Sequence, residues 1–277
     1  YTRNLIMPEL PEVVVTLNGL ISHITGKRVS KVVVREPRLR WPVPGDLPEQ
    51  LCGKVLIDGR QRAKYLLFRF DHGHLMIHLG MSGNLRIVQA GTPPAKHDHV
   101  DISFEGGVQL RFTDPRRFGS VLWLSGEPEQ HKLLSYLGPE PFEPVFDGNH
   151  LYHLSRGKKV SVKQFLMDNK IVVGVGNIYA NESLFLSGIR PKKAAGHVSR
   201  KTYEILSENT KTVLKRAIEQ GGTTLKDFVG NEGKPGYFKQ ELYVYGRGGM
   251  PCLRCKMLLK EIRLGQRSTV YCPVCQK

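Results

Sequence analysis

Apolar residues recur at helical spacing near the start of the chain and in short runs after it. Val14, Leu17 and Ile21 lie three or four residues apart, which predicts one helix over residues 11–24 that begins at a proline and stops before a glycine. Short β-rich runs bounded by Gly, Pro and Asp follow, and they predict strands at 29–34, 65–70, 75–79, 84–88, 100–104, 108–112 and 120–124. Strands at this spacing are typical of a β-sandwich or a barrel.

A proline-rich stretch, residues 138–144, separates this part from a helical one. Its three prolines fix φ and remove backbone donors, so neither a helix nor a strand continues through it. Beyond it we predict helices at 149–154, 160–167, 178–186 and, opened by Ser199, a long helix that ends near Gly221. Its expected buried stripe is Tyr203, Leu206, Thr210, Val213 and Ala217. Residues 241–277 return to short strands, which completes an α+β fold.

Four of the five cysteines form two Cys-x-x-Cys pairs, Cys252 with Cys255 and Cys272 with Cys275. Each pair can bind one metal ion from a tight turn, and the spacer between the pairs fits a hairpin that closes a tetrahedral site. Four thiolates leave no open coordination position, so we expect one structural Zn²⁺ per chain. A disulfide pairing is the alternative, which the lack of a secretory signal disfavours. Cys52 is predicted to be an inert, packed thiol.

Basic residues are concentrated in the second half of the chain. The sequence has 41 Lys+Arg and 25 Asp+Glu, so its formal charge is 41 − 25 = +16. Residues 1–150 contribute 18 − 16 = +2, whereas residues 151–277 contribute 23 − 9 = +14. Such a charge attracts polyanions, of which nucleic acid is the commonest inside cells. No apolar run approaches the roughly 18 residues of a membrane span, so we expect a soluble intracellular protein with no membrane partner.

Short motifs follow one another along the chain in a specific order. They read MPELPEV at 7–13, RAKY at 62–65, HLGMSG at 78–83, KHDH at 96–99, TDPRRFG at 113–119, GVGNIY at 174–179 and GGTT at 221–224. Together with the two Cys-x-x-Cys pairs and the short strands around them at 241–277, this set closely resembles the formamidopyrimidine-DNA glycosylase family of bacterial enzymes that excise oxidised purines. The related endonuclease VIII branch typically has Gly where Leu10 stands, which favours the oxidised-purine branch.

The resemblance implies a bifunctional DNA glycosylase and AP lyase of base excision repair. Its nucleophile would be Pro8, the N-terminal residue once Met7 is removed, because a secondary amine that attacks C1′ can form an iminium and acidify the C2′ proton. By resemblance, Glu9 is the general acid for sugar opening, Lys64 assists β-elimination and Arg267 assists δ-elimination. We expect Glu12 to position the sugar or the base.

The resemblance also implies that the damaged nucleotide is extruded from the duplex. Met81, Arg116 and Phe118 would occupy the gap that it leaves, since unstacking a base costs energy that inserted side chains partly recover. Contacts with the DNA backbone or duplex are expected from His97, Arg116, Lys159 and Asn177. A basic cluster of Arg156, Lys158, Lys159 and Lys163 lies nearby in sequence, and residues 223–238 would cover the extruded base.

Each of these residues also has a purely structural interpretation when it is taken alone. Pro8, Pro11, Glu9 and Glu12 suit the start of a helix, where prolines and acidic residues are favoured. Met81 and Phe118 would by default lie in a core, and the basic cluster would be a solvated helix face. Lys64 and Arg267 would be surface residues.

The implied fold has three domains: an N-terminal β-sandwich with a flanking helix at 8–138, a helix-two-turns-helix domain at 139–240 and a β-hairpin zinc finger at 241–277, after an extension with the initiator Met at 1–7. The expected partner is double-stranded DNA with oxidised purines or abasic sites, bound by a monomer in the bacterial cytoplasm at the nucleoid. If residues 1–7 stay attached, Pro8 is an amide without a nucleophilic lone pair. This extension motivates one alternative, a catalytically silent, zinc-dependent binder of damaged or distorted DNA. A further alternative is an RNA-binding zinc-ribbon module.

Overall fold

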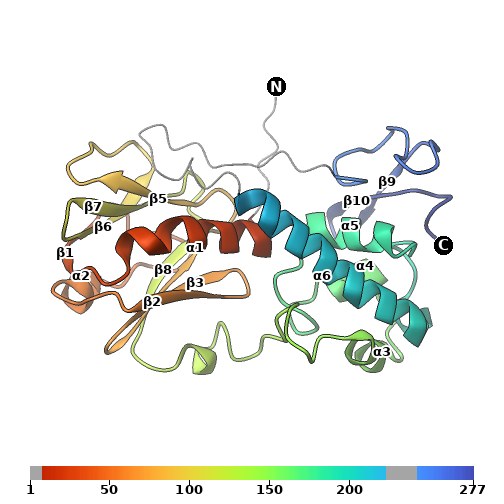
Figure 1. The fold of residues 1–277 in the computed structure, drawn as a ribbon, viewed down its shortest axis with the longest axis horizontal. Helices are drawn as coiled ribbons and strands as arrows, with labels where there is room; N and C mark the ends of the chain where they lie inside the picture. Colours follow the sequence, from red (N-terminus) through yellow and green to blue (C-terminus); the bar gives the residue numbers. More distant parts are fainter. Residues whose placement is uncertain (1–7, 223–241) are drawn as a thin grey trace. The chain divides into compact units, whose positions relative to one another are not determined.

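The computed structural model describes residues 8–222 and 242–277, which form two compact units (Figure 1). The first unit contains the described residues up to Ser135 together with residues 218–222, and the second contains Tyr136–Ala217 and the described C-terminal segment. No helix of the described ranges is long and apolar enough to cross a membrane.

Two four-stranded antiparallel sheets form the first unit. One has the strand order β1-β6-β7-β5, and the other has the order β2-β3-β4-β8. The strands of the former are β1 (Val29–Val34), β5 (Asn84–Gln89), β6 (Asp98–Phe104) and β7 (Val108–Thr113). Those of the latter are β2 (Asp58–Arg62), β3 (Tyr65–Phe70), β4 (Gly73–His78) and β8 (Ser120–Leu124). Apolar side chains of both sheets meet in one core, which makes this unit the predicted β-sandwich.

Helix α1 (Leu10–Ile24) packs against β2, β3 and β5 and adds its apolar face to the core. The helix approaches β2 closely at Gly59, where an added Cβ would lie 2.6 Å from Ile21 Cδ1. The sequence did not predict β2, because its residues, DGRQR, have neither apolar alternation nor β-branched side chains. The one-turn helix α2 (Leu47–Leu51) was also missed, since it is shorter than any periodicity can detect.

The second unit is helical and ends in a β-hairpin. Its helices are α3 (Gly148–Ser155), α4 (Val162–Leu166), α5 (Asn177–Leu186) and, as far as Ala217, α6 (Arg200–Gly222). Side chains cap three of them: Asp147 accepts from the His150 N–H, Ser161 from Gln164 and Ser199 from Thr202. The long helix α6 corrects one expectation, since Leu214 rather than Val213 is buried in its stripe.

The hairpin consists of β9 (Lys260–Leu264) and β10 (Arg267–Tyr271), and β10 packs on α5. Gly265 and Gln266 both have positive φ, as a two-residue type I′ turn requires. Phe185, Val244, Leu259 and Val270 form a small core with two of the cysteines. The predicted α+β fold is therefore confirmed, whereas the expectation that Cys52 is packed is wrong: this thiol is exposed just after α2, where no apolar layer covers it.

Candidate functional site

The start of α1 holds the residues expected to carry the chemistry. Pro8 is half-buried, and Glu9 is the N-cap residue of α1 with only 3% of its surface exposed. The Glu9 N–H donates to Glu12 Oε2 at 2.8 Å, and the Glu9 side chain accepts in return from the Glu12 N–H. This reciprocal capping box fixes the residue that follows Pro8. Glu12 thus orients Glu9 through its backbone.

Lys64 lies in the tight turn between β2 and β3, whose first residue, Ala63, has a φ of +54°. The helix that begins after Pro8 and Glu9 packs on these two strands. Beside the turn, Tyr65 pairs with His78, and their ring centroids lie 4.8 Å apart. Burial, followed by the charge of Lys64, lowers the pKa of His78 to about 4. His78 is therefore neutral near pH 7 and accepts the Gly80 N–H on Nδ1 at 2.9 Å.

Three connections of the sandwich carry the residues expected to fill the gap in the duplex, Met81, Arg116 and Phe118, and the expected DNA contact His97. Met81 follows β4, His97 precedes β6, and Arg116 and Phe118 lie between β7 and β8. Phe118 is 43% exposed, so it is not a core residue. The Arg116 guanidinium carbon lies 4.7 Å from the centroid of the Phe118 ring, which makes a cation–π pair at the surface.

The second unit contains the remaining expected DNA contacts. Lys159 is exposed before α4, and Asn177 is the first residue of α5, after Gly174 with a φ of +81° and Gly176 as N-cap. Backbone N–H groups at a helix start suit an anion. Arg267 is exposed at the first position of β10, directly after the type I′ turn.

Lys163 connects Asn177 to the strand that begins with Arg267. Its Nζ donates to Asn177 Oδ1 at 2.6 Å, to the Ser268 carbonyl at 2.9 Å and to Thr269 Oγ1 at 2.7 Å. Lys163 is only 1% exposed. The expectation that it belongs to a solvated or DNA-facing cluster is therefore wrong, because its ammonium is buried and donates hydrogen bonds to three groups of the same unit.

Glu182 on α5 fixes the segment that leads into the finger. Its carboxylate accepts the backbone N–H groups of Tyr243, Val244 and Tyr245 at 2.8–2.9 Å. Burial raises the pKa of Glu182, against the three backbone hydrogen bonds. The sequence offered no signal for this residue, since a glutamate within an apolar helix has no motif of its own.

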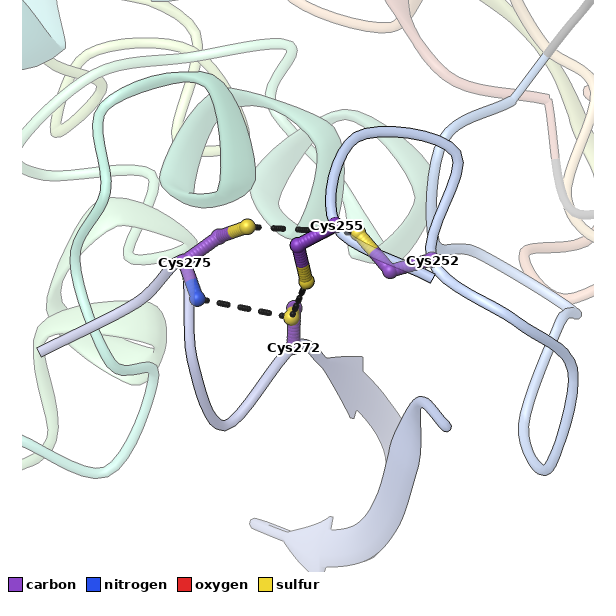
Figure 2. A group of neighbouring side chains, drawn as sticks. All are labelled: Cys252, Cys255, Cys272 and Cys275. Atoms are coloured by element: carbon purple, nitrogen blue, oxygen red, sulfur yellow. Dashed lines mark hydrogen bonds between the residues drawn. The ribbon is translucent and has the colours of Figure 1, made fainter. Parts of the chain in front are cut away.

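The four cysteines lie in the two turns that precede β9 and follow β10, and their side chains converge (Figure 2). Their Sγ atoms all lie within 4.8 Å of one another, with Cys252 to Cys275 at 4.0 Å and Cys255 to Cys272 at 3.4 Å. A tetrahedral Zn²⁺ with Zn–S bonds of about 2.3 Å separates its sulfurs by about 3.8 Å.

Both turns have the same backbone form, which supports the fit. The Cys252 carbonyl accepts from the Lys256 N–H at 2.9 Å, and the Cys272 carbonyl accepts from the Gln276 N–H at 3.1 Å. Without a cation, burial and then the neighbouring sulfurs raise the pKa of Cys275 to about 12. Four thiolates in this space therefore need a cation, and the donor set fits one structural Zn²⁺ and no catalytic one.

Comparisons with known proteins agree with this geometry over the length of the chain. The profile of the formamidopyrimidine-DNA glycosylase N-terminal domain matches residues 7–121, that of the H2TH domain of the same enzyme matches 137–229, and that of a zinc finger found in FPG and IleRS matches 249–277. The formamidopyrimidine-DNA glycosylase of Pseudomonas putida strain W619 is 59% identical over 271 residues, 98% of this chain and 100% of that protein. The chain belongs to the formamidopyrimidine-DNA glycosylase family.

Other members of the family agree. The formamidopyrimidine-DNA glycosylase of Stutzerimonas stutzeri strain A1501 is 58% identical with the same coverage. Lactococcus lactis Fpg, solved bound to DNA with an AP site, matches with a TM-score of 0.86 and 31% identity over 97% of this chain and 99% of that one. MutM in complex with DNA that contains carbocyclic 8-oxo-G matches with a TM-score of 0.88 and 32% identity, over 98% and 100%.

Among the residues expected to act on DNA, the first unit contains Pro8, Glu9, Glu12, Lys64, Met81, His97, Arg116 and Phe118. The second unit contains Lys159, Asn177, Arg267 and the four cysteines of the two pairs. The expected cover over an extruded base, 223–238, and the extension, 1–7, lie outside the described residues. Sequence reasoning missed His78, Glu182 and the buried state of Lys163. A single signal was available for His78, its place at the start of the HLGMSG motif.

Proposed function

We propose that this chain is a bifunctional DNA glycosylase and AP lyase of base excision repair that excises oxidised purines, such as 8-oxoguanine and formamidopyrimidines. The observation that carries the proposal is its 59% identity, over the whole length of the relative, to a formamidopyrimidine-DNA glycosylase. The geometry supports it, because the capping box with Glu12 fixes Glu9, the residue next to Pro8, at the start of α1.

Pro8 is the nucleophile of the proposed reaction. Its secondary amine forms a bond to C1′ of the extruded nucleotide as the bond between C1′ and the base breaks, and the base leaves with a proton. Glu9 donates a proton to the sugar ring oxygen as the ring opens, which leaves an iminium between C1′ and the Pro8 nitrogen. Glu12 holds Glu9 in place through the hydrogen bond to its N–H.

Strand cleavage follows from the same iminium. Loss of the C2′ proton expels the 3′ phosphate, and a second elimination expels the 5′ phosphate, after which water releases the Pro8 amine. Lys64 assists the first elimination, and Arg267 assists the second. The turn that carries Lys64 joins the two strands on which α1 packs, which is compatible with a common site for Pro8 and Lys64.

DNA is held by both units in this proposal. Met81, Arg116 and Phe118 fill the gap left by the extruded nucleotide, and the exposed Arg116–Phe118 pair has the form of an insertion wedge. His97, Lys159 and Asn177 contact the backbone. The four thiolates hold one Zn²⁺, which folds the finger and orients the hairpin of Arg267.

The domain limits and the cellular setting belong to the same proposal. We infer a sandwich domain at 8–138, a helix-two-turns-helix domain at 139–240 and a finger at 241–277, which the matches at 7–121, 137–229 and 249–277 support. The protein acts as a monomer on double-stranded DNA in the bacterial cytoplasm, at the nucleoid. Its active form begins at Pro8.

Borohydride trapping tests the function directly. Two preparations are compared by mass spectrometry and activity: one begins at Pro8, and one retains residues 1–7. Each is incubated with a duplex that contains one 8-oxoguanine, in the presence of borohydride. We expect base release and a covalent adduct from the chain that begins at Pro8, and neither from the extended chain, because an amide nitrogen cannot form the iminium.

The opposite outcomes select the alternatives. No adduct from a chain that begins at Pro8 would refute the proposal. Tight binding of lesion duplex without base release would instead favour a catalytically silent, zinc-dependent binder. A structured RNA that displaces the lesion duplex would favour an RNA-binding ribbon module.

A further inference from the structure

Asp114 lies beneath the three loops that carry Met81, His97 and the Arg116–Phe118 pair. It is fully buried at the end of β7. Its Oδ1 accepts the Ser82 hydroxyl at 2.6 Å and the Arg116 N–H at 3.3 Å, and its Oδ2 accepts the Gly119 N–H at 2.7 Å. One carboxylate therefore joins the loop after β4 to both ends of the loop between β7 and β8.

The backbone of Asp114 joins the third loop. Its N–H donates to the His97 carbonyl at 3.0 Å, and its carbonyl accepts from His99 Nε2 at 2.7 Å and from the Arg117 N–H at 3.2 Å. The buried side chain and both backbone groups of one residue thus hold three separate segments. All three segments belong to the same compact unit.

Glycines bring two of these loops into backbone contact. A Cβ on Gly80, whose φ is +66°, would lie 2.5 Å from the Gly119 nitrogen, and a Cβ on Gly119 would lie 2.6 Å from the His78 carbonyl oxygen. The loop after β4 is also tightened by the Gly83 N–H, which donates to the Leu79 carbonyl at 2.8 Å. The Ser82 hydroxyl therefore links the two loops across a close backbone junction, since it donates to Asp114 Oδ1 and also accepts the Arg116 N–H at 3.2 Å.

We propose that Asp114 and Ser82 are positioning residues that hold Met81, Arg116 and Phe118 as one preformed wedge for insertion into DNA. The inference rests on the proposed function, since it concerns the step in which the lesion nucleotide is extruded. Phe118 and Arg116 are exposed on a loop, so an unsupported pair would have to be ordered at the moment of binding. Asp114 fixes the backbone at Arg116 and Gly119, on both sides of Phe118, before DNA arrives.

The test compares Ser82→Ala with Ser82→Thr, which keeps the hydroxyl. Single-turnover release of 8-oxoguanine from a duplex is measured beside borohydride trapping on a duplex with a preformed abasic site. Loss of a part-buried hydrogen bond to a carboxylate predicts a decrease of roughly tenfold to a hundredfold in base release for Ser82→Ala. Ser82→Thr should release the base at nearly the wild-type rate. Trapping should fall much less, because an abasic site has no base to unstack.

Asp114→Asn should show the same pattern more strongly, and Ser82→Ala provides the test if that variant does not fold. The proposal is overturned if Ser82→Ala releases the base at the wild-type rate, if Ser82→Thr fails to restore it, or if both reactions fall equally. A wild-type chain that begins at Pro8 and neither releases base nor forms an adduct would refute the proposed function itself, which separates the two failures.

Discussion

Replacing Lys163 by Met tests whether this ammonium stabilises the second unit or binds DNA phosphate. The methionine keeps most of the length of the side chain but removes the charge and all three donors. Asn177 Oδ1, the Ser268 carbonyl and Thr269 Oγ1 then lose the bonds that now measure 2.6, 2.9 and 2.7 Å. These three groups belong to the start of α5 and to β10, the two elements expected to present Asn177 and Arg267.

The magnitude follows from burial. A buried polar group that loses its partner costs about 1–3 kcal/mol. Thr269 is fully buried, whereas Asn177 is half-buried and can be hydrated in part. The desolvation cost of the ammonium, which the variant no longer has, offsets some of the loss. We therefore expect Lys163→Met to destabilise the second unit by about 2–4 kcal/mol.

The assay combines urea unfolding with the salt dependence of DNA affinity, and Lys159→Met is the matched control. Lys159 is exposed, so its loss should leave stability unchanged and lower the slope of log K against log salt by about 0.9, the value for one phosphate contact. Lys163 is 1% exposed and cannot reach a phosphate without unfolding. Its variant should be less stable and should bind DNA more weakly at every salt concentration with an unchanged slope.

One result refutes this reasoning. If Lys163→Met retains wild-type stability while the salt slope decreases as it does for Lys159→Met, the ammonium contacts phosphate and its hydrogen bonds are not structural. A stability loss without any change in affinity would show that Asn177 and Arg267 do not depend on Lys163 for their positions.

Three further predictions concern the metal, the acid and a buried histidine. Chelation of Zn²⁺ should expose β9 and β10 to hydrogen exchange and abolish DNA binding while β6 and β7 stay protected, and retained binding in metal-free protein would contradict this. Glu9→Gln should slow base release by at least about a hundredfold with little change in Tm, because the amide oxygen can still cap α1; an unchanged rate would exclude Glu9 as the acid. Burial and Lys64 lower the pKa of His78 to about 4, so between pH 6.5 and 4 the unfolded chain binds a proton that the folded chain does not, and stability falls as the pH falls. Urea unfolding at pH 7 and 5 should show a smaller loss in His78→Gln, and equal losses would contradict the assignment.

Most of the fold could be predicted because its elements bury one apolar face. The run 29–34 and the run 65–70 coincide with β1 and β3, since β-branched and aromatic residues mark a half-buried strand. Strand β2 could not be predicted in this way. Its polar residues form a strand because β3 pairs along its whole length and α1 covers Gly59, and both are tertiary causes.

The sequence predicts a site residue where the chemistry requires a particular residue type, as at the cysteines. It does not predict the burial or the partners of a residue, because these depend on tertiary packing. The spacing of the cysteines alone predicted a metal site, and their sulfurs do converge. The burial of Lys163 was not predictable, because a lysine is expected to be solvated unless its neighbours in space are known. Asp114 illustrates the same limit. It belongs to the TDPRRFG motif, but the motif does not reveal its hydrogen bond to Ser82, which lies 32 positions away in the sequence.

Exposed charges of this chain can interact with counterions and phosphate, whereas buried charges cannot. Lys163 is enclosed among neutral oxygens, and Arg111 is bound to Asp101 at 2.8 Å with only 2% of its surface exposed. Four thiolates and one Zn²⁺ add −4 + 2 = −2 to residues 151–277, which reduces their +14 to +12, and the buried Lys163 and Glu182 cancel each other in this sum. Counterion release counts only charges that approach phosphate. If the proposed function holds, we expect the affinity for DNA to depend on exposed residues such as Lys159, while buried charges such as Lys163 hold Asn177 and the strand of Arg267 in position.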